Sequence, residues 1–116
     1  MEIPKLILEN IDEQAAVFSA LADPTRLKLV KLLCRQRDPD ALCVNALASL
    51  LGVTQSAVSQ HLRVLKGVGL VKGARRGSRV HYSLDEGAAE RLRGLLSSAL
   101  TGAHPQDGGD CEECRA

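Results

Sequence analysis

Apolar residues in the first fifth of the chain recur at the spacing of an amphipathic helix. Such a helix places every third or fourth residue on one face. The pattern predicts a helix from about Ile7 to Ala22. The residues that repeat at this spacing are Ile7, Ile11, Ala15, Phe18 and Ala22.

A second helix is expected directly after Asp23. Asp is a favoured N-cap residue, and Pro24 has the fixed φ that suits the first helical position. The helix should run to about Arg35 and be followed by a turn from Gln36 to Ala41, which contains Pro39 and two Asp. The residues expected to face inward are Leu27, Val30 and Leu33.

Two further helical patterns are separated by a glycine. The first covers Val44–Leu51 and is followed by Gly52, a usual C-terminal stop. The second starts after Thr54, a suitable N-cap, and continues to about Lys66. Two short helices joined by such a turn predict a helix-turn-helix. The inward residues expected are Val44, Leu47 and Leu51 on the first helix, and Val58, Leu62 and Leu65 on the second.

The pattern then changes to the period of two that is typical of strands. Strands are expected at 70–72 and 80–84, joined by a basic glycine-containing turn from Arg75 to Arg79. A hairpin in this position makes the fold a winged helix-turn-helix, mainly α with a β-hairpin wing (α-α-α-α-β-β-α). Asp85 can cap a last helix from Glu86 to Thr101. Its expected apolar stripe is Ala89, Leu92, Leu96 and Leu100.

Composition places these elements in one domain, 1–101, followed by a flexible Cys-containing tail, 102–116. Hydrophobic residues make up 45% of the 116, enough for one modest core. No apolar run is long enough to span a membrane, and the N-terminus does not have the pattern of a signal peptide. A cytoplasmic protein is expected, in which the four Cys are thiols or metal ligands rather than disulfides.

The net charge of +1 is uninformative, but the distribution of charge is not. No Asp or Glu occurs from Ala41 to Leu84, and the charged side chains there are all Lys and Arg. Such a block favours a surface for a polyanion over a set of unrelated solvated charges. Double-stranded DNA fits, because a helix enters the major groove and a basic wing reaches the backbone or the minor groove. The candidate DNA-binding residues are Gln55, Ser56, Ser59, Gln60 and Arg63 on the helix, and Arg75, Arg76 and Arg79 in the wing.

Several segments resemble the ArsR/SmtB family of metal-sensing repressors. They are 20–33, 42–44, 52–65, and the wing from Gly69 to Leu84. The resemblance implies a homodimer that binds an operator with an inverted repeat and is released by a metal or metalloid. It also implies that the first and last helices form the dimer interface. The family's recognition positions correspond here to Gln55, Ser56, Ser59 and Gln60.

Three thiols are candidates for the sensor. Cys43 stands at a helix N-cap, where a thiolate is favoured, although a small half-buried apolar role is the alternative. The family's arsenic and cadmium/lead sensors carry Cys-x-Cys there, but this chain has Asn45 in place of the second Cys. Cys111 and Cys114 can supply the missing sulfurs unless their pairing is accidental. Three sulfurs suit As(III), which we favour, or Cd(II), Pb(II) or Hg(II), with no organic cofactor.

The other candidate sites and functions are weaker. Cys34 is expected in the core, on the face of Leu27 and Val30. The family's zinc/cobalt site is not expected, because Ala88 stands where its first His would be. A thiol redox sensor is the alternative function, although acidic neighbours of Cys111 and Cys114 disfavour thiolates there. An enzyme is not expected, since Cys-x-x-Cys without a surrounding βαβ unit lacks the scaffold of an oxidoreductase.

Overall fold

The computed structural model describes residues 11–35, 42–100 and Glu113. The elements are α2 (Ile11–Leu21), α3 (Pro24–Arg35), β1 (Leu42–Cys43), α4 (Val44–Leu51), α5 (Gln55–Gly67), β2 (Val71–Arg76), β3 (Arg79–Leu84) and α6 (Glu86–Leu100). This order of helices, antiparallel hairpin and final helix confirms the expected winged helix-turn-helix. The first residues of the first expected helix, the 36–41 turn and nearly all of the expected tail lie outside the described residues.

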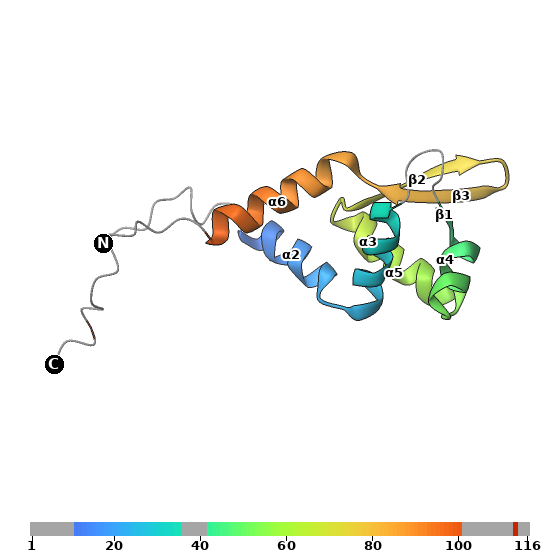
Figure 1. Ribbon diagram of the computed structural model, residues 1–116, viewed down its shortest axis with the longest axis horizontal. Helices are drawn as coiled ribbons and strands as arrows, with labels where there is room; N and C mark the ends of the chain where they lie inside the picture. The colour runs from blue at the N-terminus through green and yellow to red at the C-terminus, as the bar shows by residue number, and fades with distance from the viewer. Residues whose placement is uncertain (1–10, 36–41, 101–112, 114–116) are drawn as a thin grey trace.

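The molecule is elongated, with the wing at one end and the last helix leading to the other (Figure 1). Helices α3, α4 and α5 pack together beside the hairpin, and α6 runs from β3 away from the wing. Helix α2 lies beside the outer part of α6. The arrangement separates a head, made of the helix-turn-helix and wing, from a frame made of α2 and α6.

The core centres on α3, α4 and α5. Its largest fully buried side chains come from these helices: Leu29 and Leu33 on α3, Leu47 on α4, and Val58, Leu62 and Leu65 on α5. Ala20, Leu70, Val71 and Ala88 complete the core. The inward stripe predicted for α5 is therefore confirmed. The stripe predicted for α4 is also supported, because Val44 and Leu51 pack against the core beside Leu47.

The inward face predicted for α3 is partly wrong. Leu29 and Leu33 form the buried row, Val30 packs beside it, and Leu27 is 45% exposed. Cys34 is exposed as well, so its expected core role is wrong. Leucines occur all around this helix, and periodicity alone cannot decide which of two apolar faces meets the core.

The first and last helices show the same ambiguity. On α2 the core contacts are made by Val17, Ala20 and Leu21, whereas Ile11 is 44% exposed and Ala15 and Ala22 are also exposed. On α6 the buried residue is Ala88, next to the expected Ala89. Farther along α6, the expected Leu96 and Leu100 are 45% and 79% exposed. Both helices therefore carry exposed apolar side chains among the residues that the structure describes.

The ends of the helices follow local capping chemistry, as the sequence indicated. Asp23 Oδ2 accepts a hydrogen bond from the Arg26 amide at 3.0 Å, and this bond is the main reason why the pKa of Asp23 is lowered. Thr54 Oγ1 accepts from the Ala57 amide at 3.1 Å. Gly52 ends α4 in the left-handed conformation, with φ at 67°, which glycine adopts without a steric penalty.

The sheet contains one strand that the sequence pattern did not reveal. Its order is β1-β3-β2, and all pairs are antiparallel. Arg76 pairs with Arg79, so the wing turns through Gly77 and Ser78 alone, and Gly77 has a φ of 64°. The two-residue strand β1 aligns Cys43 with His81 on β3. A strand this short has no period for a sequence pattern to show.

Two leucines on α3 give a direct test of which face forms the core. Leu33→Ala should lower the free energy of unfolding by about 2–5 kcal/mol, because its fully buried side chain would leave a cavity. Leu27→Ala is the matched control, and we expect less than about 1 kcal/mol at this exposed position. Urea denaturation measures both values. Equal losses would contradict the packing described for α3.

Candidate functional site

The outer face of α5 presents polar side chains to solvent. Gln55, Ser56, Ser59, Gln60 and Arg63 are all exposed, as the sequence predicted. The opposite face is fixed in the core by Val58, Leu62 and Leu65. Because the buried stripe fixes the rotation of α5 about its axis, these polar residues form one continuous reading surface. Their contacts with DNA remain a prediction.

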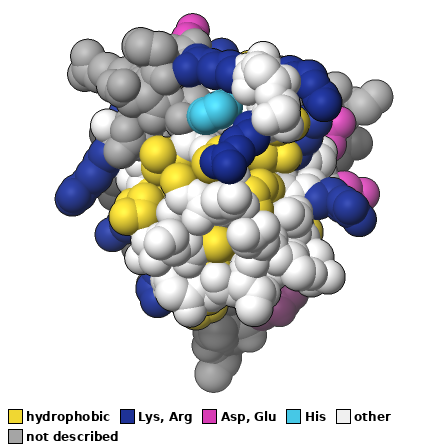
Figure 2. All heavy atoms as spheres, turned by 90° about the vertical axis from the view of Figure 1, so that its right-hand side faces the viewer, with side chains coloured by type: hydrophobic (Ala, Val, Ile, Leu, Met, Phe, Trp, Pro, Cys, Tyr) yellow, Lys and Arg dark blue, Asp and Glu magenta, His cyan; other side chains and the backbone are white. Residues whose placement is uncertain are grey.

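The wing adds positive charge at the same end of the molecule. Arg75 and Arg79 are exposed, and Arg76 is half-buried. Figure 2 shows this end, where Lys and Arg side chains gather around the upper part of the face and acidic side chains lie mainly at its margins. The basic stretch of sequence therefore becomes a basic surface. Such a surface attracts a polyanion over long range.

A polar junction fixes the buried side of α5 to the corner between α2 and α3. Arg26 lies at its centre, and its Nε donates to the Ala20 carbonyl oxygen at 2.6 Å. Its Nη1 lies 3.3 Å from His61 Nδ1 on α5, and the same imidazole nitrogen is 3.9 Å from Asp23 Oδ2. Sequence reasoning assigned Asp23 only a capping role and missed this junction. Its partners are 35 residues apart in the chain, and no local pattern links them.

Cys43 occupies the N-cap of α4 with an extended backbone and a half-buried side chain. The thiol does not accept a capping hydrogen bond from the first turn of α4. The Ala46 amide nevertheless lowers the pKa of Cys43, burial opposes this, and the Arg79 side chain lowers it further. A cavity of about 250 Å³ lies beside the thiol and is also lined by Arg79 and Tyr82. The candidate sensor thiol therefore adjoins a candidate DNA-binding residue of the wing, which the sequence did not indicate.

The other predicted thiol ligands, Cys111 and Cys114, lie outside the described residues. Within residues 11–35, 42–100 and 113, no group of three or more His, Cys, Asp or Glu side chains is placed to hold a metal ion. Of the three predicted thiol ligands, the described part of the chain contains Cys43. No two other described His, Cys, Asp or Glu side chains are placed to bind a metal ion together with it.

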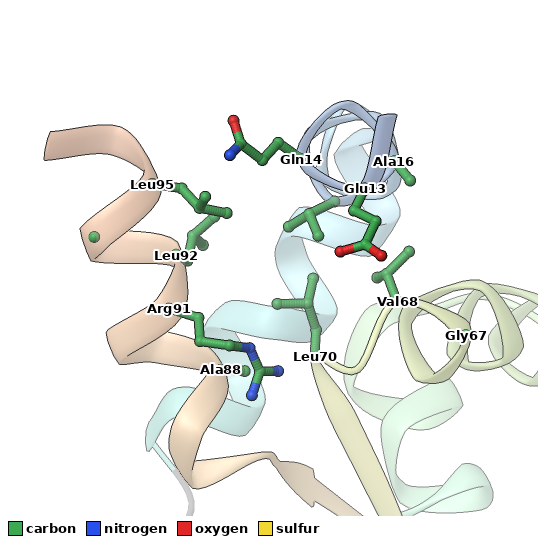
Figure 3. A pocket seen from close by; sticks show the side chains of 12 residues that line it. Glu13, Gln14, Ala16, Gly67, Val68, Leu70, Ala88, Arg91, Leu92 and Leu95 are labelled. Carbon is green, nitrogen blue, oxygen red and sulfur yellow. The ribbon is translucent and has the colours of Figure 1, made fainter. Parts of the chain in front are cut away.

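A groove of about 580 Å³ lies between α2 and α6 (Figure 3). Its walls are mainly apolar, and Arg91 crosses one end, where Nη2 donates to the Gly69 carbonyl oxygen at 3.1 Å. The apolar residues that line it are Ala16, Val17, Val68, Leu70, Ala88, Leu92 and Leu95. The groove belongs to the frame, at the other end of the molecule from the wing.

Comparison with known sequences identifies the family. Residues 23–72 match the family described as bacterial regulatory protein, arsR family. A cadmium resistance transcriptional regulatory protein CadC homolog from Staphylococcus aureus is 36% identical over 95 residues, 82% of this chain and 74% of that protein. The chain belongs to the ArsR family. ArsR-family proteins are DNA-binding transcriptional regulators rather than enzymes.

A transcriptional repressor SmtB homolog from Synechocystis sp. is 48% identical over 77 residues. That match covers 66% of this chain and 55% of the relative, so the chain spans about half the length of that protein. The solution structure of a homodimeric winged helix-turn-helix domain from Mycobacterium bovis, a possible ArsR-family regulator, has a TM-score of 0.63 and 30% identity. It covers 85% of this chain and 87% of that domain. No helix in the described part of this ArsR-family chain is long and apolar enough to cross a membrane.

The environment of Cys43 predicts a reactive thiol. In a protein whose other thiols are replaced by Ser, the midpoint of the pH profile for alkylation should lie below that of a free cysteine thiol measured under the same conditions, because the Ala46 amide and Arg79 stabilise the thiolate. Removing the guanidinium with Arg79→Ala should move the midpoint upward. Timed alkylation followed by mass spectrometry gives both profiles. An unchanged midpoint in Arg79→Ala would show that Arg79 does not affect the ionisation of Cys43.

Proposed function

We propose that this ArsR-family protein is a homodimeric repressor that a thiophilic metal or metalloid ion releases from its operator. The observation that carries the proposal is the position of Cys43. This residue starts α4 of the helix-turn-helix, lies in β1 beside the wing strand, and adjoins Arg79. A ligand on this thiol would therefore act directly on the DNA-binding head.

Operator recognition is assigned to α5 and the wing. The amide of a Gln such as Gln55 or Gln60 can pair with an adenine edge, and Ser56 and Ser59 can bond to a base or a phosphate. Arg63 can take guanine or phosphate in the same groove. The wing arginines, Arg75, Arg76 and Arg79, then contact the backbone or the minor groove. The exposed polar face of α5 and the basic wing support this division of roles.

A pair of variants tests that division. Gln55→Ala should lose about 1–3 kcal/mol on the operator and little on unrelated DNA, because it removes a base contact. Arg75→Ala should weaken both complexes and reduce the slope of log affinity against log salt by about 1, because it removes a phosphate contact. Fluorescence anisotropy at several salt concentrations measures these effects. Equal losses on both DNAs for Gln55→Ala would exclude it from base readout.

Dimer assembly is assigned to the frame. Ile11 on α2 and Leu96 and Leu100 on α6 are exposed large apolar residues, and the groove lies between the same helices. The related Mycobacterium bovis domain is homodimeric. A second copy that covers these side chains would set the distance between the two α5 helices. Two half-sites about 34 Å apart, one turn of DNA, then match the two heads.

Release is assigned to Cys43, with Cys111 and Cys114 as the further thiolate ligands. When it is ionised, Cys43 is an anionic neighbour of Arg79, and a bound cation would cancel that charge and repel the guanidinium. Arg79 and β3 would then move relative to α5. A coupling of about 1–3 kcal/mol between the ion and the operator is enough for a 5- to 150-fold loss of affinity.

Titration of operator-bound protein with As(III), Cd(II), Pb(II), Hg(II) and Zn(II) tests this release. At least one thiophilic ion should lower operator affinity about 5- to 150-fold in the unmodified chain. Cys43→Ser should bind the operator and lose the response, since Ser is a good N-cap and preserves α4. Cys34→Ser, the matched control at an exposed position of α3, should keep the response.

Two outcomes would contradict this assignment. Release of Cys43→Ser by the same ion would remove Cys43 from the sensor. Release by a thiol oxidant, with none by any of the five ions, would favour a redox-sensing repressor. Deletion of residues 102–116 tests the two further thiols separately, and an unchanged ion response would remove them from the proposal.

A further inference from the structure

His81 has a buried ring nitrogen for which the described part of the chain provides no hydrogen-bond partner. Its Nδ1 is buried and has no hydrogen-bond partner among the residues that the structure describes. The other described histidine differs, because His61 Nδ1 lies near both Arg26 and Asp23. A buried polar atom without a protein partner is uncommon, and such an atom often binds an ion or a water molecule. The nitrogen of His81 is therefore available to a ligand.

The strand register brings His81 to the sensor thiol. Cys43 on β1 is directly opposite His81 on β3. Opposed residues of an antiparallel pair have side chains on the same face of the sheet, with Cβ atoms about 4.5–5.5 Å apart. That separation lets one ion contact a sulfur and an imidazole nitrogen, whose bonds to zinc are about 2.3 Å and 2.0–2.1 Å.

The neighbouring residues indicate which face this is. Leu42 and Tyr82, the adjacent opposed pair, pack against the hydrophobic core. Because side chains alternate along a strand, Cys43 and His81 belong to the outer face. Arg79, two residues before His81 on β3, shares that face, in agreement with its effect on the pKa of Cys43. The pair therefore lies away from the core and next to a wing arginine.

We propose that His81 is a ligand of the ion sensed at Cys43 and that it selects divalent ions of the Zn(II), Co(II) and Cd(II) type. This inference rests on the proposed function and deepens it. Imidazole together with thiolate suits such borderline ions, whereas As(III) takes thiolates and does not require a nitrogen ligand. The described residues thus supply a mixed nitrogen and sulfur pair at the sensor.

Co(II) is the most informative probe, because its absorption bands report the ligands directly. In the reduced full-length protein, Co(II) should give a sulfur-to-metal charge-transfer band that Cys43→Ser weakens. His81→Gln should keep a charge-transfer band, shift the ligand-field bands and weaken Co(II) binding at least about tenfold. Identical bands and affinity in His81→Gln would overturn the proposal.

Two controls separate this result from a loss of structure or of the whole function. His61→Gln changes the other described histidine and should leave the Co(II) bands unchanged. For His81→Gln, the ratio of Cd(II) to As(III) concentrations needed for half release from the operator should rise at least about tenfold. An unchanged ratio, or release by As(III) with no Co(II) or Cd(II) binding, would refute the role of His81 and leave release by thiolates standing. Absence of release by every ion in the unmodified chain would instead refute the proposed function.

Discussion

The buried stripe of Val58, Leu62 and Leu65 sets the rotation of α5, and this helix is joined to the corner between α2 and α3 by Arg26. This side chain donates to the Ala20 carbonyl at the end of α2 and lies beside His61 on α5, while the capping Asp23 lies next to both. The junction fixes the frame to the buried side of α5. The opposite side, with the candidate DNA-binding residues Gln55 and Ser59, is exposed. The same junction therefore links α2 to the helix that carries the candidate DNA-binding residues.

The sheet provides a second connection, between the thiol and the wing. Strand β1 has only two residues, yet it places Cys43 opposite His81 and near Arg79. Charge changes at the thiol therefore act on β3 at short distance, where screening by salt is weak. The head is therefore contacted twice: the Arg26 junction connects α2 to α5, and the pairing of β1 with β3 connects Cys43 to the wing. In the proposed function, an ion at Cys43 would act through the sheet, and a second copy of the chain would act through the Arg26 junction.

The elements that sequence predicted best are those with local signals. Asp23, Thr54 and Gly52 fix the ends of α3, α5 and α4 by capping chemistry within a few residues, and the structure keeps them. The stripe of α5 was also predictable, because its other face is polar. The faces of α3 and α6 were not, since leucines occur on more than one side of each helix. Leu27 and Leu96 were expected on the inward faces for that reason, and both are exposed.

The candidate site divides in the same way. Exposure of Gln55 and its neighbours follows from the position of the buried stripe, so sequence predicted it. The closeness of Cys43 to Arg79 and His81 depends on strand pairing between residues far apart in the chain, which no local pattern encodes. The junction of Arg26 with His61 is equally distant in sequence.

Ligand binding at the Cys43 thiol should be transmitted through the sheet to the wing. Mapping of backbone amide chemical shifts on addition of Cd(II) to the free protein tests it most directly. We expect the largest changes in β1, in the first turn of α4 and along β3 from Arg79 to Tyr82. Changes confined to α2, α6 and the chain beyond Leu100, with β1 and β3 unaffected, would contradict it.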